Sequence, residues 1–261
     1  MKVVTDQCQR EVTLPDFPAR IISVVPSQTE LLFDLKLGER VVGITKFCVH
    51  PDSWFRGKPH VGGTKNLNFD RIYSLKPDLI IANKEENTKQ EIERLAADFP
   101  VWISDVKSLA DATAMIASVA SITGTSETGE KLIDYIETAF GSMQPLNEGY
   151  SALYLIWKEP WMSVNHDTFI HDMMKVCGLV NCTAEFSDRY PVLSDMQIRE
   201  LNPDLILLSS EPFPFSEKHI LEIKRLAPKA RIGLVDGESF SWYGSRLCQT
   251  PFYLQKLINL W

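Results

Sequence analysis

Aromatic and charged side chains gather in three segments of the C-terminal half, and this mixture suits the binding of a bulky, ring-containing ligand. The segments cover residues 157–161, 209–215 and 237–243, at predicted strand ends. Loops are usually polar, so rings in them predict the flat walls of a cleft and nearby charges predict orienting contacts. The candidate ligand-binding residues are Trp157, Lys158, Glu159, Trp161, Glu211, Phe213, Trp242 and Tyr243. The alternative is that these rings close a core.

Polar side chains also follow predicted strands in the N-terminal half. Ligands of open parallel sheets bind beyond the carboxyl ends of the strands, so these positions are candidates as well. They are Ser27, Gln28, Lys46, Lys65 and Glu85. His50 joins them because it lies in a strand-end loop two positions after Cys48. One such imidazole is enough to contact the metal of a bound chelate.

Motifs for catalysis and for a protein-held metal are missing. The chain has no GxSxG elbow, no P-loop and no GxGxxG after its first strand. Its five histidines and five cysteines show no HExxH or CxxC spacing. We therefore predict no catalytic residues, no metal site and no cofactor, and an enzymatic role is disfavoured.

Strands that alternate with helices must position the candidate residues. A turn at 26–28 and a helix over 29–37 follow the first predicted strand. The motif Leu-Lys-Pro-Asp-Leu-Ile at 75–80 returns as Leu-Asn-Pro-Asp-Leu-Ile at 201–206, which indicates two similar halves. Nearly all-apolar strands predict parallel sheets covered on both faces. These strands are expected at 21–25, 41–44, 79–82, 101–104, 153–157 and 205–208.

A long helix is predicted between the two halves, over residues 126–144. Leu132, Ile136 and Phe140 recur at helical spacing, and Pro145 ends the pattern. Gly129 and Gly141 weaken this helix by up to about 1 kcal/mol each relative to Ala. We expect an N-terminal lobe at 1–124, a bridging helix at 125–146 and a C-terminal lobe at 147–261.

Composition excludes several classes of partner. Of 261 residues 44% are hydrophobic, which is ample for a buried core, and 34 acidic against 27 basic side chains disfavour nucleic acid. The longest apolar runs fall far short of the roughly 20 residues that cross a bilayer. Residues 1–6 show no apolar leader, so we expect either a cytoplasmic protein or one whose signal was removed.

The chain resembles the class III solute-binding proteins of ABC importers, the helical-backbone metal receptor superfamily that binds iron siderophores, haem or cobalamin. The motifs Pro26-Ser27, Thr29-Glu30 and Lys76-Pro77-Asp78-Leu79 carry this resemblance, which covers essentially the whole chain. It implies two α/β lobes, each with a mainly parallel sheet flanked by helices, bridged by a single long helix. A metal chelate would lie in the cleft between the lobes of a periplasmic or cell-envelope monomer that serves metal transport through an ABC permease.

The resemblance also implies roles for particular residues. It puts His50, Thr64, Trp161 and Tyr190 at ligand-facing places, and Thr64 stands where cobalamin binders carry a tryptophan, which disfavours cobalamin. Members dock on the permease through an acidic residue of each lobe. Asp70 matches the first, and the second falls at Met196, beside Asp195.

Two other functions compete with the binding protein. One is a cytoplasmic relative that handles tetrapyrroles or metals as an enzyme, with His50 and either Glu85 or Glu159 as metal and proton handlers. The other is an interaction module in which the aromatic loops contact a protein.

Overall fold

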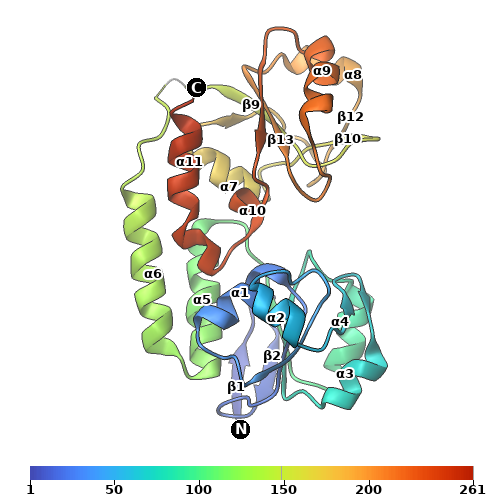
Figure 1. Ribbon diagram of the computed structural model, residues 1–261, viewed down its shortest axis with the longest axis vertical. Helices are drawn as coiled ribbons and strands as arrows, with labels where there is room; N and C mark the ends of the chain where they lie inside the picture. The colour runs from blue at the N-terminus through green and yellow to red at the C-terminus, as the bar shows by residue number, and fades with distance from the viewer. Residues whose placement is uncertain (148, 261) are drawn as a thin grey trace. The chain divides into compact units, whose positions relative to one another are not determined.

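Two compact units make up the chain in the computed structural model, which describes residues 1–147 and 149–260 (Figure 1). Unit 1 comprises Met1–Val106, Ala110–Glu137 and Tyr243–Cys248, and unit 2 comprises Lys107–Leu109, Thr138–Trp242 and Gln249–Trp261. Each unit holds one four-stranded sheet flanked by helices. The predicted mixed α/β class is thus confirmed. Among the described helices, none is long and apolar enough to span a membrane.

The sheet of unit 1 is entirely parallel and follows the order β4-β3-β7-β8. Its strands are apolar except for the polar residues that end β3, β7 and β8, and nearly every position is buried, as expected for parallel strands covered by helices. Their bounds are β3 (Ile21–Ser23), β4 (Val41–Ile44), β7 (Leu79–Asn83) and β8 (Val101–Ser104).

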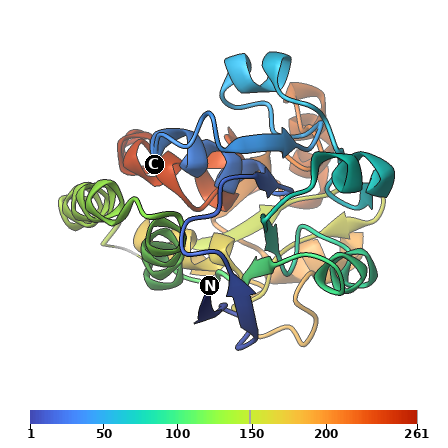
Figure 2. The same ribbon diagram turned by 90° about the horizontal axis from the view of Figure 1, so that it is seen from below.

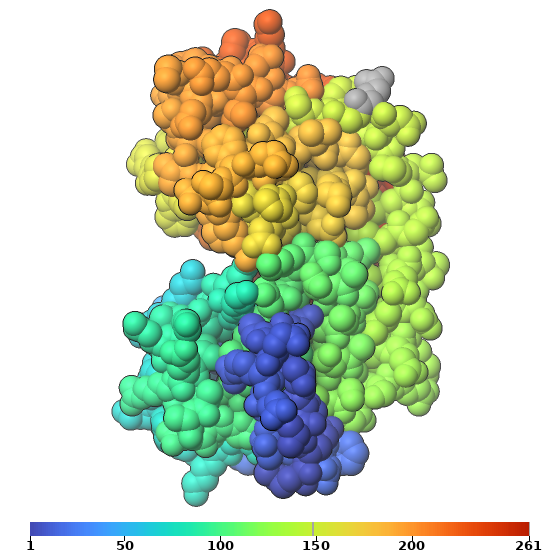
Figure 3. All heavy atoms as spheres, turned by 180° about the vertical axis from the view of Figure 1, so that it is seen from behind, coloured from blue at the N-terminus to red at the C-terminus, as the bar shows by residue number. Residues whose placement is uncertain are grey.

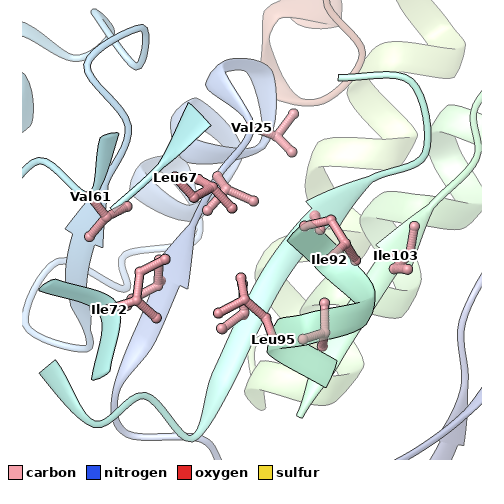
Figure 4. Close-up of a cluster of buried hydrophobic side chains, with 12 residues drawn as sticks. Val25, Val61, Leu67, Ile72, Ile92, Leu95 and Ile103 are labelled. Atoms are coloured by element: carbon pink, nitrogen blue, oxygen red, sulfur yellow. The ribbon is translucent and has the colours of Figure 1, made fainter. Parts of the chain in front are cut away.

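Helices cover the two faces of this sheet. One face packs Ile22 and Ile80 against Ile72 of α3 (Phe69–Leu75) and Leu95 of α4 (Lys89–Ala96), in the cluster shown in Figure 4. Figure 1 shows α5 (Leu109–Thr123) on the opposite side of the unit from α3 and α4.

The first helix, α1 (Pro26–Asp34), starts three residues before the predicted one. Residues 26–28, which were expected to form a loop turn, instead form the first turn of this helix. Proline suits its first position, because an N–H group there would have no partner within the helix.

Smaller elements complete unit 1. The antiparallel pair β1 (Lys2–Thr5) and β2 (Glu11–Leu14) is tied to the sheet where Gln7 N donates to Ile103 O over 3.1 Å. Figure 3 shows these N-terminal residues, in dark blue, on the surface of the unit. A short helix, α2 (Asp52–Gly57), precedes the two-residue strands β5 (Gly62–Gly63) and β6 (Asn66–Leu67).

The helix predicted between the halves is α6 (Ser126–Gly141), which ends three residues before the expected Gln144. Figures 1 and 2 show its first part beside α5. A Cβ on Gly129 would lie 2.4 Å from the Cβ of Ala120 on α5, so this glycine permits the close crossing. The residues of α6 up to Glu137 belong to unit 1 and those from Thr138 belong to unit 2.

Unit 2 repeats the arrangement with a parallel sheet in the order β11-β9-β13-β14. In both sheets the second strand in the chain lies at one edge, beside the first. The bounds are β9 (Ser151–Leu155), β11 (Val180–Asn181), β13 (Leu205–Ser209) and β14 (Arg231–Val235). The same order in both units accounts for the repeat seen in the sequence.

Helices cover the unit 2 sheet as well. On one face Leu153 and Ile206 pack against Ile198 of α8 (Asp195–Leu201) and Ile223 of α9 (Glu217–Leu226). Tyr154 points to the other face and contacts Phe240 with ring centroids 5.1 Å apart. The remaining elements of the unit are β10 (Trp161–Met162), α7 (Phe169–Val176), β12 (Val192–Leu193), α10 (Glu238–Ser241) and α11 (Thr250–Ile258).

The repeated Pro-Asp motif has the same structural role in each unit. Asp78 accepts hydrogen bonds from the backbone N–H groups of Ala19 and Arg20, at 2.8 and 2.7 Å. Asp204 accepts from the backbone N–H of Ser151 at 2.9 Å. Each carboxylate therefore fixes the start of the strand that pairs with its own, β3 in unit 1 and β9 in unit 2.

Candidate functional site

A buried polar layer covers the carboxyl ends of the strands in unit 1. Ser23, Thr29, Thr45, Asn83 and Ser104 are all at most 2% exposed. Thr29 Oγ1 donates to Ser23 Oγ at 2.7 Å, and Asn83 Nδ2 donates to Ser104 Oγ at 3.0 Å. Hydrogen bonding offsets the cost of burying these groups, so the layer is a firm floor beneath the strand-end loops.

Gln28 and Cys48 belong to this floor. Gln28 is fully buried and its side-chain N–H donates to Ser104 Oγ, so this residue contributes to the layer. Cys48 Sγ lies 3.1 Å from both Thr29 Oγ1 and Thr45 Oγ1, and burial raises the pKa of the thiol. A buried thiol of raised pKa is unreactive. Ser27 is buried in the same first turn of α1.

Asn83 and Asn87 hold the loops above the floor. Asn87 Nδ2 donates to the carbonyl oxygens of Val24 and Thr64, at 3.1 and 3.0 Å. Asn83 Oδ1 accepts from the backbone N–H of Glu85 at 2.9 Å. These two asparagines therefore hold the half-buried candidates Thr64 and Glu85 in place. The sequence did not predict this role for either asparagine.

One predicted ligand-binding lysine and one predicted docking residue line the same pocket of unit 1. Lys46 and Lys65 are exposed and His50 is half-buried. Lys46 and Asp70, expected in different roles, both line a pocket of about 550 Å³, whereas Lys65 does not. Its other walls are Gly62, Gly63, Asn66, Leu67, Asn68, Phe69 and Arg94.

Tyr243 packs in unit 1 although its neighbour Trp242 belongs to unit 2. It is buried, and the next residue, Gly244, has φ +129°. A Cβ on Gly244 would lie 3.1 Å from the carbonyl oxygen of Ser27, so the segment lies directly on α1.

Unit 2 contains a continuous row of aromatic rings. The centroids of Trp157 and Phe213 lie 5.6 Å apart, those of Phe213 and Phe215 4.8 Å, and those of Phe215 and Trp161 6.4 Å. We call these four residues the aromatic row. Trp157 is 39% exposed and Trp161 only 7%, so the row runs from the surface to the interior.

Trp161 is held on several sides. Its Nε1–H donates to Asp195 Oδ1 at 2.9 Å, and Lys158 Nζ lies 5.7 Å from its ring centroid. Lys158 also forms an ion pair of 2.6 Å with Glu222 on α9, and this hydrogen bond raises the pKa of Lys158. The ammonium of Lys158 is therefore already engaged within the unit, while the neighbouring Glu159 is exposed.

Glu211 and Trp242 form a second polar contact in unit 2. Glu211 Oε1 accepts from Trp242 Nε1 at 2.9 Å and from Ser241 Oγ at 2.8 Å. Burial raises the pKa of Glu211. Trp242 is buried and Tyr190 is 36% exposed. Trp157, Phe213 and Tyr190 thus keep more ring surface available than Trp161 and Trp242 do.

The candidate residues from the sequence leave out several that build these surfaces, although the predicted aromatic segment 209–215 includes Phe215. Phe215 and His219 complete the packing around Phe213. The ring centroid of His219 lies 5.4 Å from the ring centroid of each phenylalanine. The floor of unit 1 could have been predicted from the polar residues, such as Ser104, that end otherwise apolar strands. Among the described residues, no group of three or more His, Cys, Asp or Glu side chains could hold a metal ion.

Known proteins resemble the chain along most of its length. Residues 21–225 match the family model described as periplasmic binding protein. The vitamin B12-binding protein of Pectobacterium carotovorum is 25% identical over 201 residues, which covers 75% of this chain and 72% of that protein. An uncharacterized ABC transporter substrate-binding lipoprotein of Bacillus subtilis is 26% identical over 215 residues, covering 78% of this chain and 68% of that protein.

Solved structures agree in fold. The periplasmic haem-binding protein RhuT of Roseiflexus sp. RS-1, in its apo form, matches with a TM-score of 0.79 at 23% identity and covers 92% of this chain and 96% of that one. These relatives are named for binding and not for catalysis. Because the family model matches more than half of the residues, the chain belongs to the periplasmic binding protein family, the class of solute-binding proteins that its sequence resembles.

Proposed function

We propose that this protein is the solute-binding component of an ABC importer and that it binds a flat metal chelate of the haem or cobalamin type. Relatives named for vitamin B12, for haem and for an ABC transporter support this reading. The observation that carries it is the aromatic row, which presents Trp157 at the end of a strand, where ligands of parallel sheets bind. A cell-envelope location follows from the same relatives as part of the proposal.

The rings of unit 2 that keep some exposed surface would supply the flat contacts. Trp157, Phe213 and Tyr190 offer aromatic surface, and each ring contact contributes about 0.5–1.5 kcal/mol beyond area burial. Trp161 and Trp242 would offer less ring surface to the ligand, because both are buried and use their N–H groups inside the unit.

Unit 1 would supply charge and a metal contact. Lys46 and Lys65 are exposed and suit the carboxylates of a porphyrin, and the half-buried His50 suits its iron. Thr64 offers no ring, whereas the resemblance puts a tryptophan there in cobalamin binders. We therefore expect haem to bind more tightly than cobalamin. A ligand position between the lobes, a monomeric state and lobe boundaries after 124 and 146 stay predictions from the sequence.

Titration with a panel of chelates tests the proposal. Haemin, cyanocobalamin, metal-free protoporphyrin and ferrichrome are added to the purified protein, and melting temperature and the visible absorbance of haem are followed. Saturation at one hundred times Kd should stabilise the fold by about 2.7 kcal/mol. We expect haemin to give the largest shift and Trp157→Ala to weaken it about 2- to 10-fold. The matched control is Tyr135→Ala, which removes an exposed ring from α6 instead.

Other results would replace the proposal. If no chelate raises the melting temperature or quenches tryptophan fluorescence, the binding function is wrong. Insertion of ferrous ion into protoporphyrin that is lost in His50→Ala would favour the enzyme. Concentration-dependent size-exclusion behaviour that ignores all chelates would favour the interaction module.

Docking is a separate part of the proposal. Asp70, on the pocket of unit 1, and Asp195, at the start of α8 in unit 2, would contact the permease as the acidic residues of the two lobes. Their side chains are exposed, as a contact with a partner requires.

A further inference from the structure

The aromatic row of unit 2 ends on a carboxylate. From the exposed Trp157 the rings follow one another at 5.6, 4.8 and 6.4 Å, and the last of them, Trp161, donates its indole N–H to Asp195 over 2.9 Å. An exposed aromatic surface and an exposed carboxylate are therefore joined by direct contacts. Everything in this chain of contacts belongs to unit 2.

The indole of Trp161 has little freedom to move independently of its neighbours. It stacks on Phe215 with only 10° between the ring planes, and Lys158, paired with Glu222, lies near its ring centroid. Its backbone pairs with Leu193 in the antiparallel β10–β12 ladder. Because close-packed side chains transmit displacement, a shift of Phe215 must be shared by Trp161.

Asp195 lies at the other end of this contact. It is the first residue of α8, only two positions beyond Leu193, and the capping box of Ser194 and Gln197 fixes the helix start. The next side chain, Met196, is 63% exposed, so the carboxylate stands on an open surface. The bond from Trp161 thus sets the direction of a carboxylate on a helix whose backbone is already fixed.

We infer that Trp161 is a positioning residue for Asp195 and that a porphyrin bound against Trp157 changes the exposure of the Asp195 carboxylate through the aromatic row. The inference rests on the proposed function and deepens it, because Asp195 is the proposed docking residue of this unit. A permease could then distinguish the loaded from the empty protein by a carboxylate that lies away from the ligand. This coupling requires that the porphyrin binds one arrangement of the four rings more tightly than another. A ligand shifts the equilibrium between two conformations only if its affinities for them differ.

Carboxylate labelling tests the positioning without any ligand. Wild type and Trp161→Phe, which keeps a ring but loses the N–H donor, are treated with a carbodiimide and glycine ethyl ester, and labelled peptides are quantified by mass spectrometry. We expect Asp195 to be labelled at least about 3-fold faster in W161F, since the exposed carboxylate loses a hydrogen bond that water replaces only in part. Glu127, whose side chain is 84% exposed, is the internal control and should not change.

The same labelling with and without haemin tests the coupling. In wild type, saturating haemin should change the Asp195 rate at least about 2-fold, and in W161F the rate should no longer respond although haemin still binds. Equal Asp195 rates in wild type and W161F without haemin would overturn the positioning. An unchanged rate in haemin-loaded wild type would overturn the coupling. If haemin binds neither protein, the proposed function fails, yet the ligand-free comparison still decides the positioning.

A spectroscopic measurement covers the case in which W161F does not fold. The indole N–H resonance of Trp161 is identified by site-specific labelling of that tryptophan, and its chemical shift is compared between wild type and Asp195→Ala. The substitution is on the surface, so the core stays intact. We expect the resonance to move upfield and to exchange faster with solvent in D195A, whereas Asp195→Asn, which keeps an acceptor oxygen, should restore most of the wild-type position. A resonance unaffected by D195A would refute the bond.

Discussion

Glu30 and Arg246 lie 216 positions apart in the sequence and form a two-pronged ion pair in unit 1, with both N–O distances at 3.0 Å. The pair joins α1 to the segment Tyr243–Cys248, which returns to this unit late in the chain. Burial raises the pKa of Glu30, and the guanidinium of Arg246 opposes that rise. The carboxylate therefore depends on its partner to remain charged inside the unit.

Removal of Arg246 alone should destabilise the protein more than removal of both partners. Arg246→Met leaves the Glu30 carboxylate without its partner, which costs about 3 kcal/mol, the low end for buried pairs, because both side chains keep some exposure. The double variant Glu30→Met and Arg246→Met removes that penalty and should recover at least half of the loss. Urea denaturation measures both. A double variant as unstable as the sum of the single ones would contradict this account.

Two glycines of α6 should respond differently to replacement by alanine. In helix interiors alanine is favoured over glycine by about 1 kcal/mol. Gly129→Ala should nevertheless destabilise the protein, because the new Cβ would meet Ala120 at 2.4 Å. Gly141→Ala meets nothing within 4 Å and should be neutral or slightly stabilising. The melting temperatures of the two variants test this expectation. A higher melting temperature for Gly129→Ala would mean that α5 and α6 do not cross this closely.

The two Pro-Asp motifs should contribute similar and independent stability. Asp78→Ala and Asp204→Ala each remove a carboxylate that holds the start of a neighbouring strand. Hydrogen bonds to charged groups contribute about 1.5–3 kcal/mol, so each variant should lose an amount in that range. Because the two sites share no partners, the losses should add in the double variant. A strongly non-additive free energy of unfolding would show that the motifs are coupled.

The parallel strands were predictable because their apolar runs leave few alternatives. Leu79–Asn83 and Leu205–Ser209 are buried at every position, and the preceding Pro-Asp motif marks each start. The helix-strand alternation then fixed the fold class. The start of α1 differs from the predicted one because Pro26 suits both a turn and the first position of a helix.

Contacts between distant segments were beyond the sequence. The strands β10 and β12 have two residues each, too few to show a period, yet they bring Trp161 to Leu193 and so to Asp195. A ring in a strand-end loop predicts either a ligand wall or a core, and the choice for Trp161 depends on Phe215, far away in the chain. The hydrogen bonds of Glu211 and Trp242 likewise require the folded loop.

The half-buried carboxyl of Glu211 should make the stability of the fold depend on pH. Its pKa is raised in the folded protein, mainly by burial, so the folded state binds the proton more tightly than the unfolded chain does. The contribution to stability is therefore fully present below the ordinary pKa of a glutamate and is lost as pH rises through the raised value. Glu211→Gln keeps the size and an acceptor oxygen for Trp242 but cannot ionise.

We expect wild type to lose stability relative to Glu211→Gln as pH rises above the ordinary pKa of a glutamate, measured by urea denaturation at fixed ionic strength. Glu127→Gln is the control, because the hydrogen bond from Lys131 lowers the pKa of this exposed carboxylate. Any pH dependence of the stability difference between wild type and Glu127→Gln should have the opposite sign. It should also be small, since solvent screens the exposed ion pair of Glu127 and Lys131. A difference between wild type and Glu211→Gln that is constant with pH would show that the bonds from Trp242 and Ser241 offset burial at this carboxylate. A difference that grows in favour of wild type as pH rises would show that these bonds outweigh burial.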